Sequence, residues 1–471
     1  MSIHDLPETR TQSVQDLNDN DYYADTTKKG TLNYKIDEAI DSQASSLHPD
    51  IQNSNFDAEK EAGGGGDASQ KTPPDGGYGW LVVFSGFAMM MFSLGVANAF
   101  GEYQKDYHVE LFPDEPMSNI AWIGTLQFAC MNLFGILVGI LCERMDSRLV
   151  TFIGGVIMAI SLIAASFIKV LWGLVLTQGL MFGIGGSCCF IPPCSLPSQW
   201  FTKKRGLAIG LAVAGSGLGG VWVTPVTHAM IQKLGFGWAL RISGILIFVI
   251  NSCASWFMRP FYPPKKRETI IDFEVLKDIR FMFVFASAVC GTCAYFAPFF
   301  YLPTFAMVKD GKSESFGTNL IIAINAASTI GRIGTGFVAD RVGRINTLIV
   351  CTLMAALSIL ILWLPFHATG TMIAMTIIYG VFCGGFISLL PVIMADLFGV
   401  HRIANIIGLL YVANFCGSIV GAPAMGAILD NVGHGTNFVP TIVFSGVFML
   451  SCTILQVCLR VSVTRKIFVK I

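Results

Sequence analysis

Twelve long apolar stretches fill this sequence from residue 80 onward, and each is close to the roughly 20 residues that a helix needs to cross a hydrocarbon core. They span residues 80–101, 118–141, 149–168, 172–196, 206–231, 238–258, 281–306, 318–339, 346–366, 371–395, 404–428 and 438–459. With 53% hydrophobic and 13% charged residues, the chain has more apolar surface than one water-soluble core can bury. We therefore predict an all-α integral membrane protein with twelve transmembrane helices.

Charge is distributed unevenly along the chain, although the formal net charge is zero. Residues 1–72 hold 14 acidic against 6 basic residues, and the remainder holds 17 acidic against 25 basic residues. The first segment is also polar, contains the run GGGG and shows no sustained apolar period, which is typical of disorder. We predict that residues 1–72 form a disordered cytoplasmic tail.

The apolar stretches fall into two sets of six, separated by the charged segment RPFYPPKKRETIIDFEVLKDIR. Two matched sets without a large soluble domain are typical of a secondary transporter built from repeats. The predicted parts after the tail are an N-terminal six-helix half at 73–258, a cytoplasmic linker at 259–280, a C-terminal six-helix half at 281–460 and a cytoplasmic C-terminal tail at 461–471.

The positions of Lys and Arg predict the orientation of the chain. If both termini are cytoplasmic, the inner loops and C-terminal tail from residue 73 onward hold 18 of these residues and the outer side holds 6. Loops rich in Lys and Arg stay on the cytoplasmic side of a membrane. We therefore predict a multi-pass protein with both termini in the cytoplasm.

The motif GSGLGG, Gly215–Gly220, matches the dinucleotide pattern G-x-G-x-x-G, but that site needs a strand before the motif and a helix after it. Here both flanks belong to one apolar stretch. Small residues four positions apart instead let membrane helices approach closely. Such pairs are Gly206 with Gly210, Gly215 with Gly219, Gly380 with Gly384 and Gly417 with Gly421. Because the sequence also has no metal-ligand spacing, nucleophile elbow or P-loop, we predict no enzyme activity and no cofactor or metal.

The segment GFVADRVGR, Gly336–Arg344, places opposite charges and glycine at a cytoplasmic helix end. Asp340, Arg341 and Arg344 are suited to pairing between helices, which a gate that closes on the cytoplasmic side requires. The segment resembles the signature loop of the major facilitator superfamily, and CERMDSRLV in the first half is a degraded copy. The alternative is that the arginines only anchor the loop on the cytoplasmic side.

Arg332 is the one charge deep inside a predicted span. At about 1.5 Å per residue it lies roughly 12 Å along the helix from Asp340. A buried cation is costly, so we expect it to face a water-filled cavity and to meet an anion or carbonyl groups. Substrate binding is the prediction, and a structural arginine bound to nearby carbonyls or hydroxyls is the alternative.

Two further motifs carry a resemblance to a narrower family. PDGGYGW (Pro74–Trp80) precedes the first span, and WFTKKRGLAIGLAVAGSGLGG (Trp200–Gly220) opens the fifth. Together they resemble the monocarboxylate porter family, and the polar tail resembles its fungal branch of monocarboxylate-transporter homologues. The resemblance covers about residues 73–460, and its signature positions are Asp75, Gly76, Gly77, Lys204 and Arg205. We expect Asp75 to complement the dipole of the first helix and the glycines to permit a sharp entry into it.

The resemblance implies a twelve-helix alternating-access carrier in which Arg332 binds a substrate carboxylate in a central cavity. Two positions depart from the family. Ser328 stands where the family has a carboxylate associated with proton coupling, and Asn98 stands where animal members use a lysine. Simple proton symport of lactate or pyruvate is therefore not expected.

Other polar and aromatic residues are candidates for the cavity lining, although each suits a helix–helix hydrogen bond or an interfacial anchor equally well. They are Asn98, Gln127, Asn132, Tyr295, Tyr301, Asn325, Ser328, Tyr411 and Asn414. In the segment CAYFAPFFYLP, the two prolines are suited to breaking a helix beside a site, and the aromatic faces suit a flat ring. Some fungal relatives of this family carry riboflavin.

We thus predict a secondary transporter for a small organic solute, with an organic anion bound by Arg332. One alternative is a carrier of riboflavin or another planar metabolite, in which Tyr295 and Tyr301 matter more. A second alternative is a non-transporting nutrient receptor that signals through its tail. The predicted partners are the lipid bilayer and the substrate, with no nucleic acid. The family implies the plasma membrane, and a vacuolar membrane is the alternative.

Overall fold

The computed structural model describes residues 73–263, 273–365, 368–434 and 436–464. The predicted N-terminal tail, part of the linker and the last residues of the chain lie outside these ranges. Every element in the described ranges is helical. Eleven helices are long and apolar enough to cross a membrane, and the pair Asn119–Leu133 and Gly135–Arg144, bent by 40°, adds a twelfth if it is one span. The predicted all-α membrane fold is confirmed.

Several of the first six spans consist of consecutive helices, because the span bends or contains a π-helical turn. They are α3 (Tyr78–Asn98), α4 (Phe100–Asp106) and the π-helical turn η1 (Tyr107–Leu111); α5 (Met117–Leu133) and α6 (Gly135–Arg144); α7 (Ser147–Ala165); α8 (Leu171–Leu174), η2 (Val175–Met181), α9 (Phe182–Ser195) and α10 (Pro197–Trp200); α11 (Arg205–Leu234); and α12 (Phe236–Phe257).

The second six spans follow a short helix, α13 (Phe273–Lys277). They are α14 (Ile279–Tyr295) and α15 (Ala297–Val308); α16 (Glu314–Val342); α17 (Arg344–Leu357) and η3 (Ser358–Trp363); α18 (Thr369–Phe398); α19 (Ile403–Asn431); and α20 (Val439–Val463). The break between α14 and α15 precedes Pro298 directly, since a proline in the first turn of a helix needs no backbone donor.

The first span is longer than its hydropathy predicts. We expected it to end at residue 101, but its helices continue to Leu111. Phe100, Tyr103 and Tyr107 recur at spacings of three and four residues and are all buried. The extension is therefore an amphipathic helix whose aromatic face packs inward, and its polar face hides it from a search for apolar runs.

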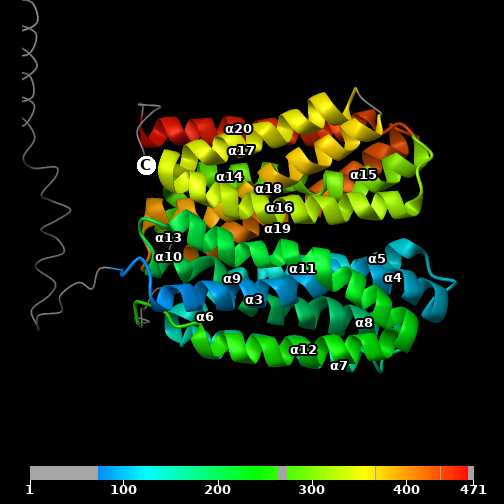
Figure 1. Ribbon diagram of the computed structural model, residues 1–471, viewed down its shortest axis with the longest axis horizontal. Coiled ribbons are helices and arrows are strands. Elements are labelled where there is room, and N and C mark those ends of the chain that lie inside the picture. Colours follow the sequence, from blue (N-terminus) through cyan, green and yellow to red (C-terminus); the bar gives the residue numbers. More distant parts are fainter. Residues whose placement is uncertain (1–72, 264–272, 366–367, 435, 465–471) are drawn as a thin grey trace, which may run out of the picture. The chain divides into compact units, whose positions relative to one another are not determined.

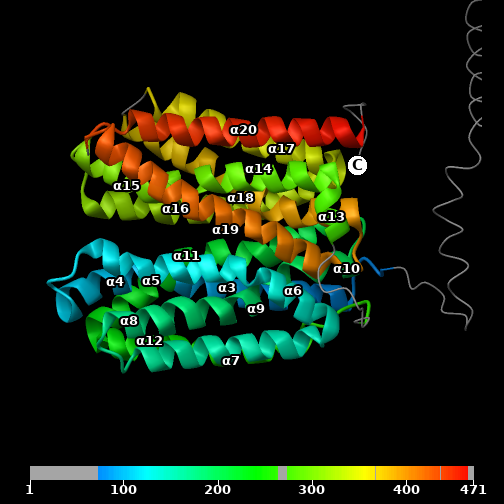
Figure 2. The ribbon, with the colours of Figure 1, turned by 180° about the vertical axis from the view of Figure 1, so that it is seen from behind.

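Figures 1 and 2 show helices α3–α12 gathered in one bundle and α14–α20 in a second bundle, with most helices along one common direction. The bundles touch where α11 packs on α16 and where α6 packs on α19. We call the end where α11 and α17 begin the network end. The opposite end, where α11 and α17 point, is the open end.

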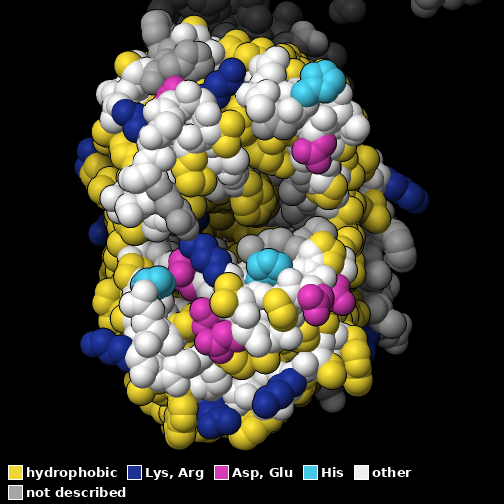
Figure 3. All heavy atoms as spheres, turned by 90° about the vertical axis from the view of Figure 1, so that its right-hand side faces the viewer, with side chains coloured by type: hydrophobic (Ala, Val, Ile, Leu, Met, Phe, Trp, Pro, Cys, Tyr) yellow, Lys and Arg dark blue, Asp and Glu magenta, His cyan; other side chains and the backbone are white. Residues whose placement is uncertain are grey.

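Close contact between the bundles is found toward the network end. A Cβ added to Gly206 would lie 2.6 Å from the carbonyl oxygen of Gly336, and one added to Gly139 would lie 2.6 Å from that of Ala404. Such backbone approach tolerates only glycine. At the open end, Figure 3 shows a deep hollow between the bundles that is lined largely by hydrophobic side chains. The structure is thus closed at one end and open at the other.

Candidate functional site

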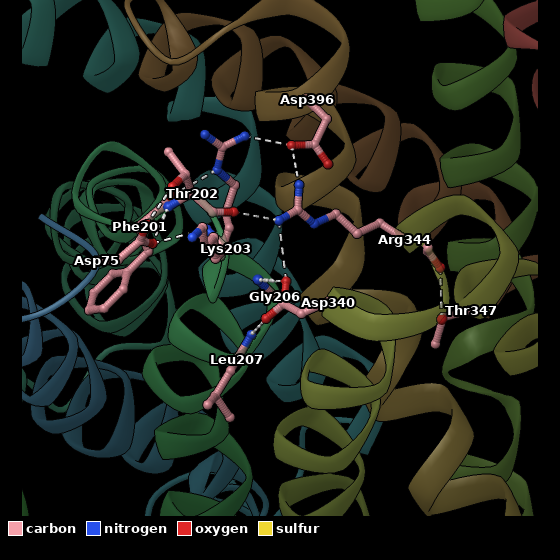
Figure 4. A network of polar contacts seen from close by, with 12 residues as sticks. Asp75, Phe201, Thr202, Lys203, Gly206, Leu207, Asp340, Arg344, Thr347 and Asp396 are labelled. Carbon is pink, nitrogen blue, oxygen red and sulfur yellow. Dashed lines mark hydrogen bonds and ion pairs between the residues drawn. The ribbon is translucent and has the colours of Figure 1, made fainter. Parts of the chain in front are cut away.

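A carboxylate from the second bundle caps a helix of the first bundle at the network end (Figure 4). Asp340, near the end of α16, accepts hydrogen bonds from the backbone N–H groups of Gly206 at 2.8 Å and Leu207 at 2.9 Å. These N–H groups belong to the first turn of α11, where no carbonyl of the helix itself can reach them. The negative charge also complements the dipole of this 30-residue helix.

Two arginines from different bundles share one carboxylate beside this cap. Asp396, at the end of α18, accepts a hydrogen bond of 2.5 Å from Arg205 and another of 2.5 Å from Arg344. Arg344 also donates to Asp340 at 3.2 Å and to the carbonyl of Thr202 at 2.9 Å. We call these contacts between Arg205, Asp340, Arg344, Asp396 and the segment 202–207 the interhalf network.

The interhalf network is largely shielded from water. Side-chain exposure is 11% for Arg205, 9% for Asp340, 14% for Arg344 and 15% for Asp396. Two positive and two negative groups balance, so the cluster avoids an unpaired charge at this depth. Opening the network end requires all the contacts between bundles in this cluster to break together.

Asp75 lies beside this network rather than at the first turn of α3. Its carboxylate accepts hydrogen bonds from the backbone N–H groups of Thr202 at 2.7 Å and Lys203 at 2.9 Å, and from the Thr202 hydroxyl at 2.6 Å. α3 has no side-chain cap, and the hydrogen bonds of Asp75 go to the segment before α11. Gly77, at φ 58°, makes the sharp entry into α3.

The pKa of Asp75 follows from these contacts. Partial burial raises its pKa, but the hydrogen bonds from the Thr202 hydroxyl and from the N–H groups of residues 202–204 outweigh that effect and hold the pKa below the usual value. The carboxylate is therefore ionised at neutral pH. It acts as a fixed acceptor for the segment that leads into α11.

Arg332 lies in α16 between the two bundles and is 6% exposed. Its guanidinium group donates to the carbonyl of Val213 at 2.8 Å and to the hydroxyl of Ser216, both in α11. Its Nε atom is buried without a hydrogen-bond partner. Of the charged residues that the structure describes, only Arg332 and Arg460 are buried, and Arg460 lies near the end of α20, where it donates to Thr464.

Aromatic and thiol groups surround the guanidinium group of Arg332. Tyr295 and Tyr411 lie close to it, together with Cys194 and Cys383. Tyr295 stands at the break between α14 and α15, where Tyr379 donates to its carbonyl at 2.7 Å. Its ring stacks on Phe299 with centroids 5.3 Å apart. Four spans of both bundles therefore meet around one cation.

The other predicted cavity residues spread along the bundle. Ser328, one turn from Arg332, is buried where α16 meets Gly384 of α18. Asn325 is half-buried beside Gly220 of α11. Asn98 is exposed at the end of α3, and Tyr301 is half-buried in α15.

Three more candidates take part in contacts within one bundle. Asn414 is buried and accepts a hydrogen bond of 3.0 Å from Thr292. Asn132 donates to the carbonyl of Phe128 in its own helix. Gln127 is buried, and its Oε1 has no hydrogen-bond partner in the structure. The structure therefore brings Arg332, Tyr295, Tyr411 and Ser328 together.

The predicted gate set also divides. Asp340, Arg344 and Arg205 join the interhalf network, whereas Arg341 lies over the ring of Phe337 at 3.9 Å, and Lys204 is exposed. Gly76 and Gly77 precede α3, and a Cβ added to either would meet no atom of the network within 4 Å. Sequence reasoning missed Asp396, Thr202 and Ser216. Only Asp396 carries a signal, as an acid at the network end of an apolar span.

Comparison with known proteins agrees with this architecture. The Major Facilitator Superfamily pattern matches residues 80–365 and 313–467. The MFS-type transporter pynF of Aspergillus niger is 35% identical, covering 74% of this chain and 81% of that protein. The fujikurins efflux protein of Gibberella fujikuroi is 29% identical, covering 88% and 89%. The human organic anion transporter MFSD10 has the same fold, with a TM-score of 0.64 at 13% identity over 82% of this chain and 100% of that structure. The chain belongs to the Major Facilitator Superfamily.

Proposed function

We propose that this protein is an alternating-access carrier that exports an organic anion, with Arg332 as the contact for the acidic group. Efflux is supported by the similarity to the fujikurins efflux protein over most of both chains. An acidic solute is supported by the buried cation and by the resemblance of the motifs around Asp75 and Trp200 to monocarboxylate porters. A solute with an apolar part is supported by the hydrophobic side chains that line much of the hollow in Figure 3.

The observation that carries the proposal is the position of Arg332 between the two bundles. A buried guanidinium group needs acceptors for its N–H groups, and here α11 supplies two of them while Nε has none. A carboxylate approaching from the open end can replace the neutral acceptors with a charged one. That exchange would favour substrate binding and would loosen the contact between α11 and α16 at the same time.

The orientation completes the proposal. We place the network end and both chain termini in the cytoplasm, as the distribution of Lys and Arg predicts. The resemblance to monocarboxylate porters implies the plasma membrane. The present conformation is then outward-facing. The interhalf network serves as the cytoplasmic gate, and the bundles rock about the α11–α16 and α6–α19 seams.

A planar metabolite such as riboflavin is the second candidate. Tyr295, Phe299 and two further stacked rings, Phe296 and Phe300, form an aromatic group beside the break in the seventh span. Flat heteroaromatic rings bind well between such faces. Under this alternative, Tyr295→Ala should reduce transport more than Arg332→Ala does.

Transport by cells that overproduce the protein tests both candidates. Labelled pyruvate, lactate, riboflavin and fujikurins are supplied, and export and uptake are compared between the parent and the Arg332→Ala variant. We expect at least a tenfold loss of transport of the acidic substrate, because a charged hydrogen bond in a buried site contributes roughly 1.5–3 kcal/mol. Arg241→Ala is the matched control, since Arg241 binds Ser166 and the ring of Phe167 away from the bundle seam. Unchanged transport of an organic anion by Arg332→Ala would refute the assignment.

A further inference from the structure

Asp75 has a backbone conformation that requires support. Its φ of 51° lies in the left-handed region, and among the described residues only His434 is another non-glycine residue with positive φ. Such a conformation persists where surrounding contacts hold it, and it is common at functional positions. The contacts here are the three hydrogen bonds to Thr202 and Lys203. The segment before the first span is therefore fixed to the segment before the fifth.

The segment that Asp75 holds also supplies acceptors to both arginines of the interhalf network. The carbonyl of Phe201 accepts a hydrogen bond of 3.1 Å from Nε of Arg205, and the carbonyl of Thr202 accepts one of 2.9 Å from Arg344. Asp75 binds the N–H groups on the other side of the same peptide segment (Figure 4). Fixing those N–H groups fixes the direction of the carbonyls, since each peptide unit is planar.

Aromatic contacts hold the two segments together. The ring of Tyr78 lies 5.3 Å from that of Trp200, and the ring of Trp80 lies 4.8 Å from that of Phe201. A Cβ added to Gly79 would lie 3.0 Å or less from Trp200 and Phe201. The entry to α3 is thus packed on the same loop that its carboxylate binds.

We propose that Asp75 is a positioning residue for the interhalf network. Asp75 touches none of the charged groups of the network. It holds the loop 201–204 so that Arg205 and Arg344 reach Asp396, and this stabilises closure of the network end. An effect of Asp75 on transport depends on the proposed alternating access. Its effect on the interhalf network depends on no substrate.

Amide hydrogen exchange on the full-length protein in lipid nanodiscs tests this inference. In Asp75→Asn, the asparagine can adopt the left-handed backbone conformation and keeps one acceptor oxygen. The charge and the second acceptor oxygen are lost. We expect the amides of Thr202 and Lys203 to exchange faster. We also expect the amides of Gly206 and Leu207, which Asp340 binds and Asp75 does not, to exchange about threefold faster or more. The second effect is the one that reports the network.

Asp146→Asn is the matched control, because Asp146 caps α7 in the same bundle through the N–H of Arg148 and has no contact with the network. Thr202→Val provides a second test that keeps the backbone donors and removes only the hydroxyl bond, and we expect a smaller change in the same direction. Faster exchange confined to residues 202 and 203 in Asp75→Asn, or no change at either site, would overturn the proposal. This test and the transport test of Arg332→Ala can fail separately, because the exchange measurement involves no solute.

Discussion

At the scale of single residues, the structural contacts of Arg332 bear directly on its proposed role in substrate binding. The sequence predicts its depth and offers two roles, substrate binding or attachment to carbonyls and hydroxyls. The structure shows the second set of contacts, to Val213 and Ser216, in a conformation that is closed at the network end. Because these acceptors belong to the opposite bundle, they also compete with any anion for the guanidinium group.

Ser216→Ala tests this competition. Without the Ser216 hydroxyl, the Arg332 guanidinium group donates only to the Val213 carbonyl. An organic anion then has to displace one acceptor instead of two. If Arg332 binds the substrate, we expect the KM for its transport to fall about threefold, which is less than the full contribution of a charged hydrogen bond. Ser161→Ala is the control, since the Ser161 hydroxyl binds only the Met158 carbonyl of its own helix. A KM that rises or stays constant would contradict the competition.

At the scale of elements, α11 has two glycine faces with different partners. Gly206, Gly210, Gly217 and Gly220 face α16 of the second bundle, whereas Gly215 and Gly219 face α3 of the same bundle. The sequence predicts close approach from the spacing of these residues, and the structure confirms it. Spacing alone cannot tell which face meets the moving partner, since both patterns overlap in one stretch.

Gly210→Ala and Gly219→Ala separate these faces. A methyl group at position 210 would overlap the carbonyl of Arg332 only while the bundles touch, so the closed network end is destabilised. Overpacking costs about 1–3 kcal/mol, which shifts the population toward an open network end by about tenfold. A methyl group at position 219 would meet Met91 and Gly95 within the bundle in either state. We expect it to lower the unfolding temperature without a shift in population.

Pulsed EPR distances check the shift. Nitroxides at Arg144 and Lys277, both exposed and on opposite bundles at the network end, report the separation after the exposed Cys253 and Cys458 are replaced by Ser. A longer distance in Gly210→Ala and an unchanged distance in Gly219→Ala is the expected pair of results. Equal effects of the two substitutions would show that the α11–α16 seam does not open.

At the scale of the whole molecule, hydropathy predicts the twelve spans well because the bilayer demands about 20 apolar residues per helix. It fails where a helix becomes amphipathic, as in the extension to Leu111. It also cannot pair side chains across the bundles. Asp396 and Arg205 are 191 residues apart, and only the fold shows that they meet. The signature loop identifies Asp340 and Arg344, but the two partners of Asp340 in α11 are backbone N–H groups that no residue pattern reveals.

The last prediction concerns the balance between the two global states. Asp396→Asn removes the charge that two largely buried arginines share, so the closed network end loses stability while the opposite state, in which these groups reach water, changes little. Solute supplied at the network end should then bind more tightly. Solute supplied at the open end should bind more weakly, and the two fold-changes should multiply to about ten, since both affinities depend on one equilibrium.

Transport into inside-out and right-side-out vesicles measures the two KM values separately. Asp114→Asn, an exposed acid between the first two spans at the open end, is the matched control and should change neither value. If one KM value falls while the other rises, a single equilibrium must connect the two ends of the molecule. Alternating access requires such an equilibrium. If both values rise together, Asp396 instead supports the fold as a whole, and the interhalf network is not the gate.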